Sequence, residues 1–187
     1  MKTVTTVLLL LFSFAAAVAA DNDETKAVQS KDKCIQVTLP KGWKSTAITE
    51  PLPDAQEHCI AATSPDGDRL IVMTVPKLDF NSLKEVAEIY IAASKEAPRF
   101  EDKVVTEPRT VKVNGQDALQ FSFQGTVDKV RIAAISTFIE SPTRWNHIRV
   151  YTDQSRVDKL RDQIDAINKS FKELPKDQPK ESPKTEP

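Results

Sequence analysis

The sequence predicts an α+β fold, an α/β/α sandwich in which one mainly antiparallel sheet is flanked by helices. Short turns separate successive apolar segments, which is typical of antiparallel strands. Two further segments have the apolar periodicity of amphipathic helices. Residues 69–75 and 129–139 are apolar on both sides of a strand, so each side needs a covering layer. These two segments are therefore expected at the centre of the sheet.

Turn residues mark the ends of the expected strands. Pro65-Asp66-Gly67-Asp68 separates HCIAATS from RLIVMTV, and Asn114-Gly115 separates RTVKV from QDALQFSFQ. Asn-Gly is the strongest short hairpin signal. The segment KVRIAAISTFIE then leads through Ser141-Pro142-Thr143 into RWNHIRVY. We expect a tight turn at each of these three places.

Two helices are expected. The first, NSLKEVAEIYIAASKEA, begins with Asn81 or Ser82 as its N-cap and ends before Pro98. The second, DQSRVDKLRDQIDAINKSF, has a charged face opposite an apolar stripe. That stripe consists of Val157, Leu160, Ile164, Ile167 and Phe171. Each helix must bury its apolar stripe against another layer.

Both ends of the chain differ from this middle part. Residues 1–20 combine Lys2, an apolar run and small residues before a cleavage point, which predicts a signal peptide and export to the periplasm or the medium. The run is too short for a spanning helix, so we expect no integral membrane segment after cleavage. Residues 21–32 are polar and are expected to form a flexible leader. Residues 175–187 repeat Pro-Lys and are expected to be an extended, disordered tail, which leaves 33–174 as the folded domain.

Cys34 and Cys59 are the only two cysteines. In an exported chain, such a pair favours a disulfide. A reactive thiol at Cys59, beside His58, is the alternative. Adjacent residues on a strand point to opposite faces, so His58 is poorly placed to activate Cys59. The disulfide is the preferred interpretation.

The composition argues against several classes of function. Basic and acidic residues nearly balance, 26 against 27, and no Lys/Arg block is present, so we expect no nucleic-acid partner. His58 and His147 lie on separate expected strands, and neither His-x-x-x-His nor Cys-x-x-Cys occurs, so no metal site is expected. A Gly-x-Ser-x-Gly elbow and a glycine-rich phosphate loop are also missing. We expect no cofactor and no catalytic residues, although a Ser-His-Asp site assembled in space stays open.

Pro40, Gly42 and Trp43 form an expected bend after the strand CIQVTL. Pro40 ends the strand, Gly42 lets the chain turn, and Trp43 follows the bend. A large ring at a fixed turn usually packs into the core. A platform for a ligand is the alternative, and we favour packing.

Trp145, His147, Arg149 and Tyr151 alternate along one expected strand and therefore share one side of it. Aromatic and cationic groups together suit recognition of an anionic or aromatic partner, which makes this side the candidate binding face. The alternative is a half-covered strand whose side chains pack together and keep their polar tips in water. We favour this second interpretation.

The order of these elements resembles the PsbP-like family, which includes the photosystem subunit PsbP, Mog-type import factors and exported bacterial DcrB-like proteins. The matching segments are IQVTLPKGW at 35–43, the helix from Ser82, VNGQDALQFSF at 113–123 and a closing helix that ends INKSF at 167–171. The resemblance spans nearly all of 33–174 and implies a sheet flanked by helices. It also implies binding or assembly rather than catalysis, without indicating the partner.

The expected function is an exported, non-enzymatic binding or assembly module whose partner is an envelope protein or a small ligand. A carrier of a small apolar ligand is the first alternative. A hydrolase with a spatially assembled site is the second.

Overall fold

The computed structural model describes residues 25–46, 59–77, 80–142 and 144–174. The expected signal peptide, the Pro-Lys tail and His58 lie outside these ranges. No helix within the described ranges combines the length and the apolar character needed to cross a membrane. In chain order, the elements are β1 (Lys26–Gln29), β2 (Ile35–Leu39), β3 (Lys44–Thr46), β4 (Ile60–Thr63), β5 (Arg69–Pro76), α1 (Leu83–Glu96), β6 (Glu101–Val105), β7 (Arg109–Val113), β8 (Gln116–Val127), β9 (Val130–Glu140), β10 (Arg144–Asp153), α2 (Val157–Ser170) and β11 (Lys172–Glu173).

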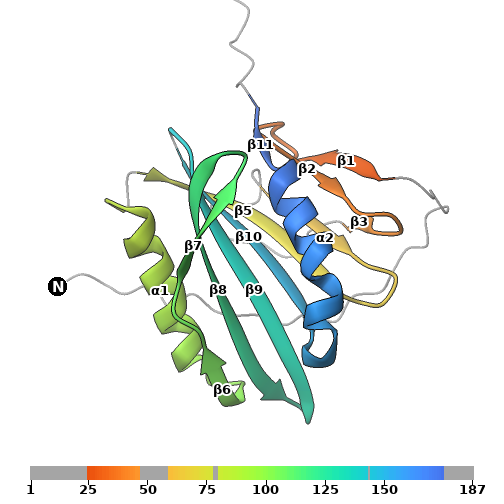
Figure 1. Cartoon of the computed structure of the whole chain (residues 1–187), viewed down its shortest axis with the longest axis vertical. Helices are drawn as coiled ribbons and strands as arrows, with labels where there is room; N and C mark the ends of the chain where they lie inside the picture. Colours follow the sequence, from red (N-terminus) through yellow and green to blue (C-terminus); the bar gives the residue numbers. More distant parts are fainter. Residues whose placement is uncertain (1–24, 47–58, 78–79, 143, 175–187) are drawn as a thin grey trace, which may run out of the picture.

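Eight strands form one antiparallel sheet in the order β3-β4-β5-β10-β9-β8-β6, and β7 pairs with the other end of β8 (Figure 1). The two strands that are apolar on both sides, β5 and β9, each lie between two neighbours, which confirms their expected central placement. Asn114 and Gly115 have φ angles of +51° and +81° and join β7 to β8, as a two-residue hairpin requires. The predicted α+β class is therefore confirmed.

A second, three-stranded sheet, β1-β2-β11, departs from the expected single sheet. It also corrects the expected flexible leader, because Lys26–Gln29 pairs with residues 36–39 of β2. β1 has few apolar side chains, of which Val28 packs partly against the core. Its order therefore depends on main-chain hydrogen bonds to β2, which the composition of the segment does not show.

Both helices begin close to the residues that the sequence indicates. The Ser82 hydroxyl accepts a hydrogen bond from the main-chain N–H of Glu85 at 3.1 Å and caps α1. Asp153 caps a single 3-10 turn, Gln154–Arg156, which leads directly into α2. The capping residues therefore set where each helix starts.

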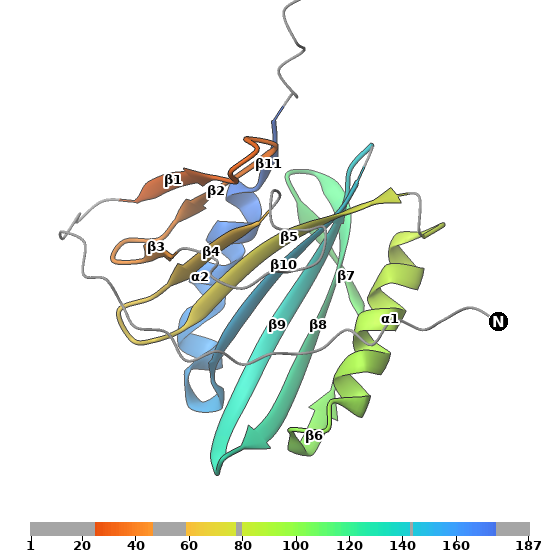
Figure 2. The ribbon, with the colours of Figure 1, turned by 180° about the vertical axis from the view of Figure 1, so that it is seen from behind.

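The two faces of the main sheet are covered by different elements. α2 and β2 cover one face (Figure 1), where Ile164 and Ile167 of α2 pack with side chains of β4, β5, β9 and β10. α1 covers the opposite face over β8 and β9 (Figure 2), where Val86 packs with Phe121 and Phe138. The expected sandwich is present, and each amphipathic helix buries its apolar side against the sheet.

A buried carboxylate ties the β4–β5 hairpin to the start of α2. Asp68 is 2% exposed and accepts hydrogen bonds from the hydroxyls of Ser64 and Thr152 and from Nη2 of Arg156, each at 2.7 Å. Arg156 also binds the Asp66 carboxylate at 2.7 Å. Donors from several elements thus compensate the charge of Asp68.

Candidate functional site

The bend after β2 places Trp43 in the core. Gly42 has a φ angle of +80°, a conformation that favours glycine, and the N–H of Trp43 donates to the Pro40 carbonyl at 3.1 Å. Trp43 is 6% exposed, packs in the core on the α2 side and donates from Nε1 to Oε1 of Gln163 at 2.9 Å. This is the environment of a core residue whose polar end is satisfied, and it leaves no exposed ring to serve as a ligand platform.

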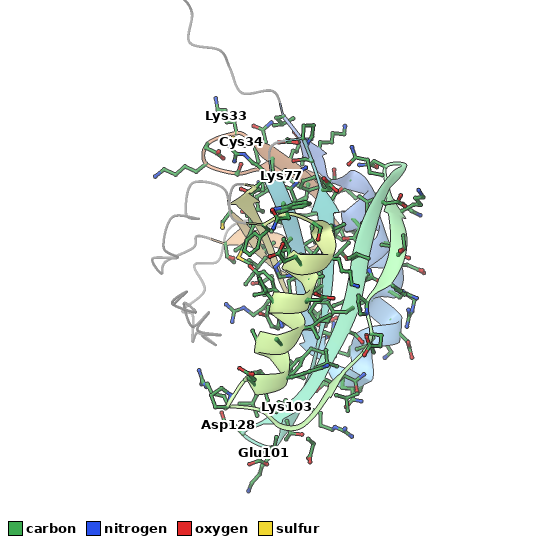
Figure 3. All side chains as sticks on the ribbon, turned by 90° about the vertical axis from the view of Figure 1, so that its left-hand side faces the viewer. Lys33, Cys34, Lys77, Glu101, Lys103 and Asp128 are labelled. Carbon is green, nitrogen blue, oxygen red and sulfur yellow. The ribbon has the colours of Figure 1, made fainter. Side chains whose placement is uncertain are left out.

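Cys34 and Cys59 are both buried, and no disulfide joins them. Cys34 lies just before β2, near one end of the molecule (Figure 3), and Cys59 lies just before β4 of the main sheet. The structure therefore does not show the predicted disulfide. Burial, and then the charge of Asp32, raises the pKa of the Cys59 thiol to about 11. A protonated thiol is a poor nucleophile, so the reactive-thiol alternative gains no support either.

The candidate binding face lies inside the protein. Trp145, His147, Arg149 and Tyr151 share the α1 side of β10, as their alternation predicts. However, His147 is 2% exposed and Arg149 4% exposed, Trp145 is buried as well, and Tyr151 is half-buried. The polar ends of His147 and Arg149 therefore do not remain in water, contrary to the favoured interpretation. The face is not an open docking surface either, since three of its four side chains are buried.

Several polar atoms on this face have no hydrogen-bond partner in the described part of the chain. They are Nε1 of Trp145, both ring nitrogens of His147, Nε and Nη2 of Arg149, and Oγ of Ser136. Ser136 lies on β9 directly opposite Arg149, while Tyr90 of α1 meets the His147 ring and Tyr151 meets the guanidinium.

We call the five residues Ser136, His147, Arg149, Tyr90 and Tyr151 the Arg149 cluster. The sequence singles out three of them. The sequence does not single out Ser136 and Tyr90, because strand pairing and the position of α1 bring them to the other three. A signal for Ser136 exists in the sequence, since it is a lone hydroxyl between Ala134 and Phe138 on one side of an apolar strand.

Aromatic rings fix the position of His147. Its ring stacks on Phe138 with the centroids 4.2 Å apart and an interplanar angle of 13°, and Tyr90 meets it edge-on at 4.6 Å. Burial, and then the positive charge of Arg149, lowers the pKa of His147 well below its usual 6.5. Burial also raises the pKa of Tyr90. Both rings are therefore neutral at neutral pH, and the positive charge of the cluster belongs to Arg149.

Arg149 is a buried cation without a counter-ion in the described residues. No acidic side chain in these ranges forms an ion pair with it, and its Cζ lies 4.8 Å from the centroid of the Tyr151 ring. This cation–π contact offsets only part of the cost of burial, because a buried ion normally requires both an opposite charge and hydrogen bonds. The Ser136 hydroxyl has no hydrogen-bonded base in the same residues. The arrangement is suited to holding an anion.

No protein-family model and no curated protein sequence matches this chain. Among solved structures, cyanobacterial PsbP (CyanoP) from Synechocystis sp. PCC 6803 is similar over 86% of this chain and 98% of its own, with a TM-score of 0.61 and 10% identity. LpqN, which is involved in cell envelope biogenesis of Mycobacterium tuberculosis, is similar over 81% of this chain and 91% of its own, with a TM-score of 0.55 and 15% identity. A protein from Bacteroides thetaiotaomicron matches over 82% of this chain but 50% of its own length, with a TM-score of 0.56 and 9% identity. The chain therefore has the fold of the PsbP-like proteins, which confirms the resemblance at the level of fold.

Proposed function

We propose that the protein is an exported accessory protein that binds a small ligand and does not catalyse a reaction. The expected signal peptide at 1–20 supports export. The fold is shared with cyanobacterial PsbP and with LpqN, a protein involved in cell envelope biogenesis. A shared fold does not transfer a partner, so the proposal depends on the site.

The burial of the Arg149 guanidinium without a counter-ion is the observation on which the proposal depends. An ion buried in this way costs several kcal/mol of stability, and an apolar side chain of similar volume avoids that cost. The described residues offer Arg149 no bond that repays it. A bound partner that supplies a negative charge explains why the cation is present.

The position of the Arg149 cluster favours a small ligand over a docked protein. The cluster lies between the main sheet and α1, and Ser136 within it is 1% exposed. A bound group must therefore enter the molecule, which a small ligand does more readily than the surface of a protein. This supports a small ligand over an envelope protein docked on β10. The ligand differs from that of the first alternative drawn from the sequence, a carrier of a small apolar ligand, because it must supply a negative charge.

Native mass spectrometry of the full chain purified from its own host tests the proposal. Wild-type protein should carry the additional mass of a small molecule. The control variant Arg131→Met, which replaces an exposed arginine of β9, should carry the same mass, whereas Arg149→Met should not. A bare wild-type mass contradicts the proposal, and so does equal loading of the two variants. Hydrolysis of an ester or peptide substrate that disappears in Ser136→Ala contradicts its non-enzymatic part.

A further inference from the structure

We infer that the Arg149 cluster binds the carboxylate of a small amphiphilic molecule, with Arg149 and Ser136 as the hydrogen-bond donors. The inference rests on the proposed function and adds the chemical class of the ligand. It follows from three properties of the cluster, namely the direction of its unbonded donors, its net charge and the apolar side chains beside it.

The unbonded nitrogens of Arg149 are a pair that forms a fork. Nε and Nη2 lie along one edge of the planar guanidinium, so their N–H bonds point to the same side. A carboxylate accepts from such a pair through both of its oxygens, in two parallel charge-assisted hydrogen bonds. One carboxylate supplies the two acceptor oxygens that Nε and Nη2 of Arg149 lack in the described residues.

Ser136 adds a third donor beside this fork. It is the cross-strand partner of Arg149, and side chains paired in this way have Cβ atoms about 4.5–5.5 Å apart. Its hydroxyl is buried and has no partner in the described residues. The cluster thus combines several unused donors with one positive charge, and an acceptor-only anion satisfies both.

The charge of the Arg149 cluster favours a monoanion. Arg149 is its cation, because His147 is held neutral by burial. A carboxylate cancels this single charge. A phosphate monoester, with a charge of about −1.5 to −2 near neutral pH, leaves a negative charge without compensation in buried surroundings. A carboxylate therefore fits the cluster better than a phosphate does.

Side chains next to the cluster indicate the rest of the ligand. Ile71 and Met73 of β5 are the cross-strand partners of Arg149 and His147, and both are half-buried. Tyr151, which contacts the guanidinium, is half-buried as well. An apolar chain that extends from the carboxylate covers this surface, and a free inorganic anion does not. The ligand class is therefore an organic acid with an apolar body.

Titration of the full chain with a matched set of decyl compounds tests the ligand class. Decanoate, decyl phosphate, decanol and decyltrimethylammonium are compared by calorimetry below their micelle concentrations, and acetate represents the head group alone. We expect decanoate to bind at least about tenfold more tightly than each of the others. Equal binding of decanol and decanoate would overturn the inference, because it would show apolar adsorption alone. Tighter binding of decyl phosphate would overturn the choice of a carboxylate.

Substitutions in the cluster test the donors. Arg149→Lys keeps the charge but loses the fork, and Ser136→Ala loses one hydrogen bond to a charged group, so each should weaken decanoate binding about tenfold or more. Arg131→Met, in the exposed arginine of β9, should bind decanoate as the wild type does. Unchanged affinity in both cluster variants overturns the inference.

The proposed function and the proposed ligand class would be contradicted by different results. If decanoate does not bind, but the host-purified protein loses its ligand in Arg149→Met, the carboxylate is wrong and the proposed function stands. If the host-purified variants Arg149→Met and Arg131→Met are loaded equally, both fail.

Discussion

Replacing Arg149 with methionine should raise the stability of the ligand-free protein. Most substitutions of buried residues lower stability, so the sign of the change is itself informative. Methionine is unbranched and flexible, so it can occupy the space of the arginine stem while removing the charge. The substitution therefore measures what burial of the guanidinium costs.

Two opposing contributions set the size of the effect. A buried ion without a counter-ion costs several kcal/mol, and Arg149 is 4% exposed with two nitrogens unbonded. The cation–π contact with Tyr151, at 4.8 Å, returns up to about 2 kcal/mol. The difference predicts a gain of about 1–3 kcal/mol in the free energy of unfolding. In a chain of this length, such a gain raises Tm by about 2–12 °C.

Urea denaturation and scanning calorimetry of the wild type, Arg149→Met and Arg131→Met measure this difference. Arg131 is exposed on β9, so its replacement should change the free energy of unfolding by less than about 0.5 kcal/mol. Each protein is first unfolded and refolded, because a retained ligand would stabilise the wild type and hide the effect. A Tm of Arg149→Met at or below that of Arg131→Met would refute the reasoning. The contacts of the guanidinium would then stabilise the protein by at least as much as its burial destabilises it. Its missing counter-ion would therefore not indicate a ligand.

Three further predictions concern the core, the β4–β5 hairpin and the pH dependence of stability. Trp43→Ala should lower the free energy of unfolding by about 3–5 kcal/mol, and Trp43→Phe, which loses mainly the bond to Gln163, by about 1 kcal/mol. Equal stability of these two variants in urea would contradict the core position of the ring. Asp68→Ala leaves Arg156 without its buried partner and should cost about 2–4 kcal/mol in the same assay, whereas a cost below about 0.5 kcal/mol would show that the network stabilises nothing. Burial lowers the pKa of His147 in the folded protein, so below about pH 6.5 the unfolded chain binds one more proton than the folded protein. The free energy of unfolding then decreases by up to about 1.4 kcal/mol for each pH unit of acidification. His147→Phe should lose this part of the slope between about pH 7 and pH 5, and identical slopes for the variant and the wild type would count against a neutral, buried imidazole.

The main sheet and both helices were predictable because their signals are local. Asn114-Gly115 tolerates the positive φ angles of a hairpin, and Ser82 can cap a helix, whatever surrounds them. The small sheet was not predictable in this way. β1 and β11 have little apolar surface, and pairs such as Lys172 with Gln36 join segments that are far apart in the sequence.

The candidate site was predictable in part. Alternation along the strand places His147 and Arg149 on one side of β10, which needs only the two-residue period of a strand. Their burial depends on α1 and on the neighbouring strands, which a single segment does not reveal. The pairing of Ser136 with Arg149 follows from the β9–β10 register, which neither strand alone determines.

Two buried charges, Asp68 in the β4–β5 hairpin turn and Arg149 in β10, differ in their surroundings. Asp68 receives hydrogen bonds from Ser64, Thr152 and Arg156, and Thr152 lies on the same strand as Arg149. Hydrogen-bond donors thus surround Asp68, whereas Nε and Nη2 of Arg149 have no acceptor in the described residues. Exposure to water does not explain the contrast, because Arg149 is 4% exposed and lies in unbroken strand register with its neighbours on both sides. We therefore attribute it to the anionic ligand proposed above. Arg149→Met should therefore both stabilise the ligand-free protein and abolish ligand binding.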